Sequence, residues 1–569
     1  MPSIRLLVLA CVIPLALGFK ELKHVSYTQL PTSISSAGAE LFQGIEKGTA
    51  DAAAYDWVNH VLYVVGRTSH LMHVIDLTDP ANPVRLFIHQ FTRGEGFPND
   101  IDICGGEIAV ALSANREVNE GHVRFYHTYT RGSGATDVVL DGYVTVGPYP
   151  KSIRYTDDCQ SVIVANEGIP GKDEFNTFVN PEGSVTIIHN ERTGNPAVQT
   201  VDFRKYNTDD AAAWPYRVPS KYIPIRPTVA EGTEPEDVVV SSDGRTAWVT
   251  LLENDAIAEI SITAQGLGLV NNAVRLPRKD WASKKVDTSD QDGGTHRRMY
   301  AGLKSLRQPG KIARLRIDNK DFLITADQGG VTSFTNAKHG FTWTDATTGK
   351  SLAANIDNPE LKANANDVGY LGRLQVSSLE GKLFDGKNAE LVMFGGRGIS
   401  IWDSKNFVSP MFDSEGSIEE YTDSFFHDIF NCDYIASTAT TKSPDTNKDT
   451  TSYRQGDFVS GLDVADDNGT VYMVVGMYGT GSLILYEVDT SAKVPIPMFQ
   501  NIVRTGGVED TWSTLYTNKK LGDLHISDLG IITSDQSPVD RPLLWVVGAG
   551  SGSVSIYNIT ESLPVIPGR

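Results

Sequence analysis

Alternating apolar and polar positions recur along this chain in about seven copies of one pattern. Each copy is a short Val-rich run, a Gly-containing turn and a second alternating run. Apolar residues at every second position on both sides of such a turn are typical of a β-hairpin with one buried face. The copies span residues 61–76, 108–127, 161–189, 247–262, 391–403, 471–487 and 543–558.

A hairpin with one apolar face cannot bury that face alone, so the copies must stack on one another. Spacings of roughly 40 to 80 residues, with loops of variable length, fit propeller blades better than the rungs of a solenoid. We therefore predict an all-β chain that forms a single β-propeller with seven blades. The segment 307–335 is the weakest, because Phe322–Ala326 resembles a strand without an identified partner, and eight blades are the alternative.

The first 18 residues predict export. Arg5 precedes the apolar run 6–17, and the small residues Ala16 and Gly18 stand before Phe19, which is the pattern of a signal peptide. The mature propeller domain, with long inter-blade loops, is then residues 19–569. No later segment approaches twenty apolar residues, so no transmembrane segment is expected, and the last residues lack the hydrophobic tail of a glycolipid-anchor signal. We predict a secreted, extracellular protein.

Cysteine and sequon positions fit that compartment. Outside the leader the cysteines are Cys104, Cys159 and Cys432. Cys104 and Cys159 lie near the starts of adjacent hairpins and are the favoured disulfide pair, and three buried thiols are the alternative. Asn468, in a hairpin turn, and Asn558, after the last strand, begin Asn-x-Thr glycosylation sequons.

The net charge of the chain limits the kinds of partner that the protein can bind. The chain has 50 Lys and Arg against 70 Asp and Glu, a net charge of −20. A surface this acidic repels nucleic acid and favours calcium, carbonate mineral or cationic matrix components. The same charge also keeps an extracellular protein in solution, which is the alternative role of the acidic surface.

Local catalytic motifs are missing from the sequence. There is no GxSxG, HExxH, GxxxxGK[ST] or CxxC motif, and we assign no catalytic residue. Two acidic loops, 287–294 and 445–449, partly resemble calcium loops, although the second has Thr450 where the turn glycine belongs. Solvated polar loops are the favoured interpretation of both.

The stretch 232–250 has the pattern of one blade. Glu234, Pro235 and Glu236 precede an apolar strand, and Asp243-Gly244 predicts the hairpin turn that follows. The innermost strand of a propeller blade borders the central channel, so Glu236 should lie at the channel entry. A carboxylate there can hold a cation or act as a general base, and the alternative is a residue that caps loop amides.

Six segments carry a resemblance to a known family: 99–102, 165–168, 181–188, 234–258, 371–374 and 395–403. They resemble the choice-of-anchor I propellers, whose animal branch includes a mesenchyme cell-surface glycoprotein of skeleton-forming cells and relatives in mollusc shells. The resemblance implies an extracellular propeller of calcified tissue that binds calcium and is sometimes anchored by glycolipid. The chain departs from the family pattern at Pro150-Lys151 and at two later blade entries, so the ring of channel carboxylates is partly dismantled.

These observations predict a secreted, acidic matrix or biomineral-associated glycoprotein that binds calcium or matrix partners without catalysis. Asp100, Glu167 and Glu236 are the candidate metal ligands, with calcium as the metal. One alternative is a calcium-dependent phosphoesterase-like hydrolase that uses the same three carboxylates. Another is a protein-interaction scaffold that uses the long loops 204–230 and 412–453.

Overall fold

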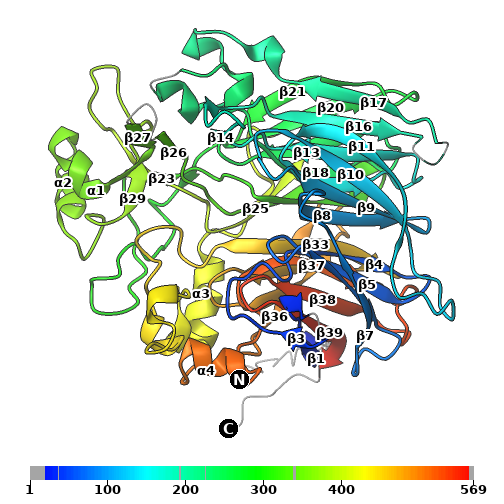
Figure 1. Cartoon of the computed structure of the whole chain (residues 1–569). Coiled ribbons are helices and arrows are strands. Elements are labelled where there is room, and N and C mark those ends of the chain that lie inside the picture. Colours follow the sequence, from blue (N-terminus) through cyan, green and yellow to red (C-terminus); the bar gives the residue numbers. More distant parts are fainter. Residues whose placement is uncertain are drawn as a thin grey trace, which may run out of the picture.

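The computed structural model describes residues 19–35, 37–190, 192, 194–223, 226–336 and 341–562. Within them the chain forms seven four-stranded antiparallel sheets arranged as the blades of one β-propeller (Figure 1). The predicted leader, residues 1–18, and the tail, residues 563–569, lie outside the described residues.

One strand of each blade lines the axis of the ring. Each of these strands packs beside the next, and β37 packs beside β4, so the ring closes with seven blades and the eight-blade alternative is wrong for the described chain. The innermost strands of blades 1 to 7 are β4 (Ala52–Asp56), β8 (Phe97–Cys104), β12 (Pro150–Tyr155), β18 (Pro235–Val240), β24 (Lys311–Ile317), β33 (Val459–Asp467) and β37 (Ile526–Ile532).

The predicted hairpins are the second and third strands of the blades, and six of the seven are confirmed. The second strands are β5 (Val61–Gly66), β9 (Glu107–Ser113), β13 (Ser161–Asn166), β19 (Thr246–Leu251), β25 (Lys320–Asp327), β34 (Thr470–Met477) and β38 (Leu543–Gly548). The third strands are β6 (Leu71–Asp76), β10 (Glu120–His127), β16 (Ser184–His189), β20 (Ala256–Ile262), β31 (Gly398–Asp403), β35 (Leu483–Asp489) and β39 (Ser553–Ser562). The outermost strands are β7 (Val84–Gln90), β11 (Val139–Pro148), β17 (Ala197–Asp202), β21 (Gly268–Arg275), β32 (Phe412–Asp413), β36 (Ile496–Val503) and β1 (Phe19–Gln29).

Blade 5 is the exception, and the hairpin predicted at residues 391–403 is wrong. The first half of that segment, β30 (Leu391–Met393), belongs to a different sheet, and β31 pairs with β25. The segment Phe322–Ala326, for which the sequence indicated no partner, lies in β25. This strand pairs with β24 on one side and with β31 on the other. An insertion between β25 and β31 separates two strands that are adjacent in space, so local periodicity could not join them.

The insertion and the long loops before blades 5, 6 and 7 form a body on one face of the ring. Helices α1 to α4 all lie on this side in Figure 1, which we call the insertion face. Its main sheet has the strand order β22 (Lys279–Asp280), β23 (Leu303–Ser305), β30, β29 (Gln375–Ser377), β28 (Ala346–Thr348). Its helices are α1 (Gly349–Leu352), α2 (Pro359–Asn366), α3 (Ser417–Phe425) and α4 (Trp512–Thr517). The described residues also form three two-stranded ribbons: β2 (Ser33–Ile34) with β3 (Glu40–Leu41), β14 (Gly171–Lys172) with β15 (Phe178–Val179), and β26 (Ser333–Asn336) with β27 (Phe341–Thr344).

The core is divided into layers between the blades. One cluster of buried apolar side chains lies between each pair of neighbouring blades, as Trp248 of blade 4 and Leu323 and Trp402 of blade 5 illustrate. Each blade therefore buries both faces against its neighbours, and strands such as β5 and β13 are buried at every position, so the expectation of one buried face per hairpin is wrong. Such a ring has no free apolar face once it closes.

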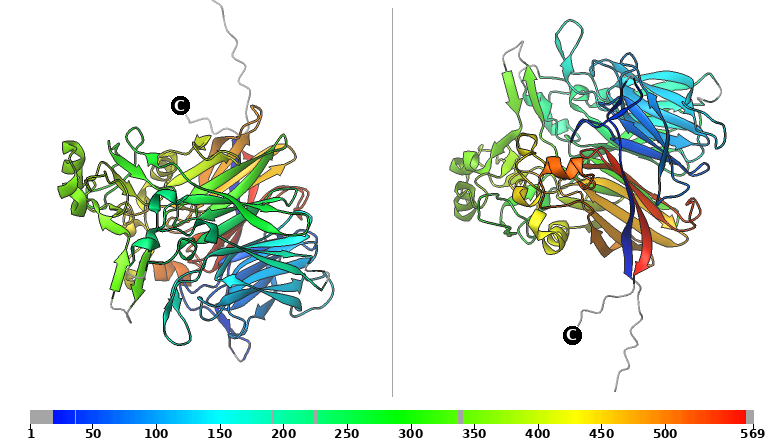
Figure 2. Two further views of the ribbon diagram at one scale, coloured as in Figure 1. Left: turned by 90° about the horizontal axis from the view of Figure 1, so that it is seen from above. Right: turned by 60° about the horizontal axis from the view of Figure 1, so that its bottom comes forward.

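Closure depends on the N-terminal strand. β1 is the outermost strand of blade 7 and runs antiparallel to β39 from Phe19 opposite Ser562 to Gln29 opposite Ser553. Figure 2 shows the two strands, blue and red, side by side along the edge of the molecule. The two ends of the described chain are thus held in one sheet.

Cys104 and Cys159 form a disulfide, with a Cα–Cα distance of 5.6 Å, so the favoured pair is confirmed. Cys104 ends β8, and Cys159 stands in the turn between β12 and β13, so the bond joins blades 2 and 3. Cys432 is a buried free thiol.

Replacing Cys104 and Cys159 by serine should lower the free energy of unfolding by about 2–4 kcal/mol, because the bond closes a loop of 55 residues in the unfolded chain. Urea unfolding of the wild type and of the double variant measures the loss. Peptide mapping without reduction provides the control, since Cys432 is the one cysteine of the described residues that should be alkylated. Labelling of Cys104 in the native protein would contradict the assignment.

The two sequons lie in different environments. Asn468 is exposed in the two-residue turn between β33 and β34, where Asn468 and Gly469 have φ values of 55° and 91°, as a tight hairpin turn requires. Asn558 was expected after the last strand, and this is wrong. It lies within β39, opposite Lys23 of β1, because pairing with β1 extends that strand to Ser562.

Candidate functional site

A channel along the axis of the ring holds the candidate site. It contains an upper cavity of about 240 Å³ at the insertion face and a lower cavity of about 360 Å³ towards the opposite face. The innermost strands of all seven blades contribute side chains to both cavities, so the site forms only in the closed ring. We call the upper cavity the channel mouth.

Aspartates in the channel tie neighbouring blades together. Asp100 of β8 accepts a hydrogen bond from the main-chain N–H of Ile153 in β12, at 2.9 Å. Asp237 of β18 accepts one from Ile312 in β24, at 3.1 Å. Each carboxylate satisfies an amide that the next innermost strand turns toward the channel, where no strand can pair with it.

The pattern repeats elsewhere in the ring. Asp528 accepts from the N–H of Ala53, at 3.0 Å, which links blade 7 to blade 1. Deeper in the channel, Asp102 and Asp463 accept from residues of β12 and β37 at 2.7 and 2.8 Å. These five aspartates therefore act as clamps between neighbouring blades.

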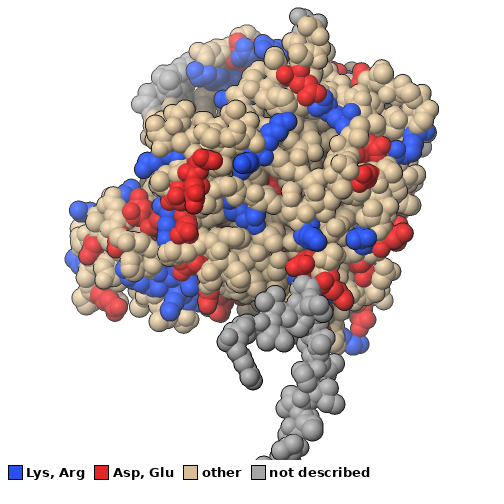
Figure 3. Space-filling view, turned by 90° about the horizontal axis from the view of Figure 1, so that it is seen from below, with Lys and Arg blue, Asp and Glu red and all other residues tan. Residues whose placement is uncertain are grey.

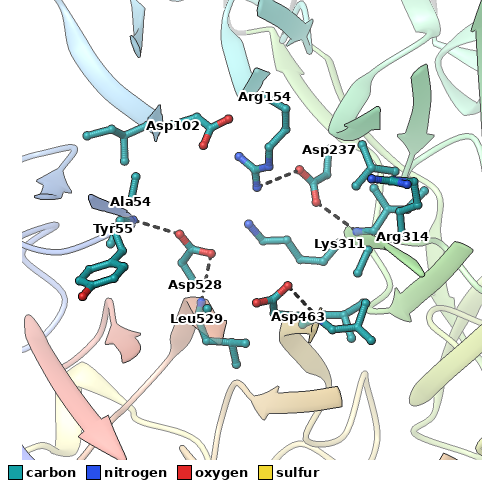
Figure 4. Close-up of a pocket in the computed structure, with 18 of the residues that line it drawn as sticks. Ala54, Tyr55, Asp102, Arg154, Asp237, Lys311, Arg314, Asp463, Asp528 and Leu529 are labelled. Carbon is teal, nitrogen blue, oxygen red and sulfur yellow. Dashed lines mark hydrogen bonds and ion pairs between the residues drawn. The ribbon is translucent and has the colours of Figure 1, made fainter. Parts of the chain in front are cut away.

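Two cations project into the channel between these carboxylates. Arg154 lies 2.9 Å from Asp100 and 3.8 Å from Asp237. The ammonium of Lys311 points into the centre of the channel (Figure 4), and it has no hydrogen bond or ion pair with any described residue. Lys311 lines both cavities, so it stands at the boundary between them.

Burial controls the protonation of the channel. It raises the pKa of Asp102, Asp463 and Asp528 to about 6 each, since the ionised carboxyl loses water. For Lys311, burial lowers the pKa, but the charges of Asp237 and nearby carboxylates outweigh it and the pKa is raised. The ammonium therefore stays charged at neutral pH.

The structure brings two of the three predicted metal ligands together. Glu167 and Glu236 flank the ammonium of Lys151, with N–O distances of 3.5 and 3.2 Å. Asp100 is engaged by Arg154 instead. Among the described residues no group of three or more His, Cys, Asp or Glu side chains is arranged to hold a metal ion, and calcium binding by these three carboxylates stays a prediction.

Two more glutamates surround this ion pair. Burial raises the pKa of Glu167 to about 8 and that of Glu253 to about 7, and it raises the pKa of Glu234 as well. One lysine cannot neutralise four neighbouring carboxylates, so this cluster carries protons near neutral pH.

The two acidic loops weighed as calcium loops are occupied by protein partners. Asp290 pairs with Arg373 at 3.0 Å, and Asp292 pairs with Arg298 at 2.7 Å. Asp449 of the second loop accepts a hydrogen bond from Ser452. These contacts agree with the favoured polar-loop interpretation of both segments.

Sequence reasoning singled out Lys151 at its blade entry but missed Arg154, Lys311 and the aromatic residues of the channel. Lys311 begins β24, and this blade entry was not identified because its hairpin is split by the insertion. Tyr149 and Tyr478 follow strand ends, and nothing in their local pattern directs them inward. Only the rule that blade entries face the channel could have found Lys311.

The outer surface is mixed in charge. Seen from below, basic and acidic side chains are interspersed over the blades and the insertion, without one dominant patch of either sign (Figure 3). Among the helices of the described residues, none combines the length and the apolar character needed to cross a membrane.

Comparison with known proteins gives a family. The model of the choice-of-anchor I domain matches residues 51–491. Gigasin-3a of Magallana gigas is 28% identical over 190 residues, which cover 33% of this chain and 64% of the relative. The mesenchyme-specific cell surface glycoprotein of Strongylocentrotus purpuratus is 28% identical over 146 residues, which cover 25% of this chain and 18% of the relative. The matches thus span less than two thirds of either relative.

Solved structures with a similar arrangement are distant in sequence. The WD40 domain of Toxoplasma gondii coronin aligns with 97% of this chain and 90% of its own, at 10% identity and a TM-score of 0.41. Saccharomyces cerevisiae Sqt1 aligns with 95% of this chain and all of its own, at 8% identity and a TM-score of 0.37.

Proposed function

Because the chain belongs to the choice-of-anchor I family, we propose that it is an extracellular propeller glycoprotein of a mineral-associated matrix that binds its partners without catalysis. The observation that carries this proposal is the engagement of the channel carboxylates. Asp100, Asp237 and Asp528 accept main-chain amides of the next blade, and Lys151 lies between Glu167 and Glu236. Carboxylates used in this way stabilise a scaffold, and few are left to bind metal or move protons.

Several independent features support an extracellular place. The Cys104–Cys159 disulfide suits an oxidising compartment, and the exposed turn at Asn468 suits glycosylation. One relative is named as a cell surface glycoprotein. The predicted leader is consistent with these features.

In this proposal calcium binds to acidic side chains on the protein surface. The chain carries 70 acidic residues against 50 basic ones, and many lie in loops. Dispersed carboxylates bind divalent cations weakly and at many positions, which suits adsorption to a carbonate mineral better than a single tight site does.

Calorimetric calcium titration of the secreted, metal-stripped protein tests the proposal, together with adsorption to calcium carbonate crystals. We expect weak binding at many sites, the same in Glu236→Gln as in the wild type, because the Glu236 carboxylate is already paired with Lys151 at 3.2 Å. Adsorption should weaken as salt is raised, since exposed charges are screened. Absence of affinity for calcium, carbonate mineral and matrix polymer alike would refute the proposal.

A second function has one observation in its favour. A carboxyl with a pKa of about 8 beside a lysine, as at Glu167, is the kind of perturbed pair found in hydrolytic sites. A calcium-dependent phosphoesterase using Glu167 and Glu236 would bind calcium stoichiometrically, and Glu236→Gln would abolish both binding and turnover. The titration above separates the two functions.

A further inference from the structure

We propose that the insertion face carries a binding site for a neutral oligosaccharide, with the channel mouth and an adjoining cavity as two sugar subsites. The second cavity has a volume of about 230 Å³ and is lined by residues of the loop before blade 6, among them Asp433, Arg454 and Gln455. Tyr478 lines both cavities. This inference rests on the proposed function for the source of the ligand, a polysaccharide of the matrix, and on the geometry below for its chemistry.

The two cavities are neighbours that share Tyr478 and a hydrogen bond between their walls. Gln328 lines the channel mouth, and the next residue, Gly329, accepts a hydrogen bond from the side chain of Gln455 at 2.9 Å. Each cavity is smaller than the about 300–1,000 Å³ of a pocket for a drug-sized ligand. Each therefore suits one small ring, and a chain of two rings would pass Tyr478.

The channel mouth contains polar groups without protein partners. In the described part of the chain, the hydroxyls of Tyr149 and Tyr478, the amide of Gln328 and the ammonium of Lys311 make no hydrogen bond, and the Ser527 hydroxyl is buried without one. These groups come from several blades and include both donors and acceptors. Among these groups the Ser527 hydroxyl alone is fully buried, and the others reach the cavity, where they are free to bind water or a polar ligand.

Stacking contacts on both faces hold the ring of Tyr478 in place. Its ring stacks on His525, with centroids 4.0 Å apart and planes 9° apart, and on Phe458 at 4.6 Å. His525 is in turn fixed by Asp433 at 2.8 Å. Because both faces of the ring are covered, its hydroxyl is the part left to contact a ligand.

Tyr149 is strained in a way that points to the same site. It lies between Pro148 and Pro150 and has a φ of 51°, a left-handed conformation that costs an ordinary residue about 1–2 kcal/mol. The guanidinium of Arg67 lies 5.3 Å from its ring centroid. Strain of this kind collects at ligand sites, where the surrounding structure maintains it.

The balance of charge in the mouth excludes other ligand classes. Four acidic residues line the mouth against three basic ones, so it has no excess of positive charge to concentrate a phosphate or sulfate ester. Lys151 already occupies the space between the two glutamates, so a metal ion would meet its ammonium. Apart from the tyrosines, Ala52 and Ile526 supply the only apolar side chains among the lining residues, which are too few to hold a peptide. A neutral polyol fits the remaining donors and acceptors.

The test is binding of labelled neutral trisaccharides (chitotriose, cellotriose and maltotriose) to the secreted full-length protein, with a heparin tetrasaccharide as the acidic comparator. We expect at least one neutral trisaccharide to bind and the acidic one not to bind. Tyr478→Phe should weaken binding about 5-fold to 10-fold, since it removes one hydrogen bond and keeps the stacked ring. Gln328→Ala should weaken it similarly.

Tyr143→Phe is the matched control, because this tyrosine is 65% exposed on the outer strand β11, and its affinity should equal that of the wild type. The inference is overturned if no neutral trisaccharide binds, if the acidic probe alone binds, or if Tyr478→Phe and Gln328→Ala leave the affinity unchanged. Adsorption to calcium carbonate is measured on the same samples. Loss of sugar binding with adsorption intact refutes the site alone, whereas loss of adsorption with sugar binding intact refutes the mineral-associated function alone.

Discussion

A variant without residues 19–29 should be far less stable than the protein that retains them, by on the order of 5 kcal/mol. The deletion removes β1, the fourth strand of blade 7, and with it the buried side chain of Leu22 and the ladder to β39. It also exposes the edge of β39, which a closed ring otherwise covers. Urea unfolding followed by tryptophan fluorescence measures the loss, since Trp545 lies in the same blade.

A control variant and a rescue experiment test whether the loss of stability is due to the missing strand β1. Phe19→Ala should change stability by less than about 0.5 kcal/mol, because Phe19 is 52% exposed at the start of the strand. A synthetic peptide of residues 19–29 added to the deletion variant should restore the unfolding midpoint, and a scrambled peptide should not. An unchanged midpoint in the deletion variant would mean that β1 does not close the ring.

The fold could be predicted wherever local alternation coincides with a blade. Six hairpins, such as β5 with β6, join strands a few residues apart, so their period of two is visible in one window of sequence. Blade 5 could not be predicted in this way, because β25 and β31 pair across the insertion. Nothing in either strand specifies a partner that far along the chain.

The site was predictable in position but not in chemistry. The blade-entry rule placed Asp100 and Glu236 at the channel, and both line its mouth. Their partners depend on the neighbouring blades: Ile153 offers Asp100 an amide, and Lys151 offers Glu236 a cation. Such partners arise from how the blades pack, so a carboxylate that looks like a metal ligand in the sequence becomes a clamp in the ring.

Arg307 illustrates how the divided blade is held together. Its guanidinium contacts Asp327 at the end of β25, at 3.0 Å, and Asp413 in β32, at 2.9 Å. It also donates to the hydroxyl of Ser400 in β31 and, at 3.0 Å, to the carbonyl of Pro277 in the loop before blade 5. Arg307 is 3% exposed and Asp327 is fully buried, so both charges depend on each other.

Arg307→Met should lower the free energy of unfolding by about 3–5 kcal/mol, because the buried Asp327 loses its cation while a side chain of similar length still fills the space. Urea unfolding at pH 7 measures the loss. The double variant Arg307→Met with Asp327→Asn is the matched control, and it should recover part of the stability, since no unpaired charge remains. A single variant as stable as the wild type would show that the ion pair contributes nothing.

The stability that Arg307→Met loses relative to the wild type should depend on pH in a defined direction. Burial raises the pKa of Asp327, and Arg307 opposes that rise, so the pKa should rise further in Arg307→Met. A carboxyl whose pKa is higher in the folded than in the unfolded protein binds more protons when folded, and folding therefore gains stability as the pH falls. The deficit of Arg307→Met relative to the wild type should thus be larger at pH 7 than at pH 5. An equal deficit at both values would mean that lost packing, rather than the uncompensated charge of Asp327, destabilises the blade.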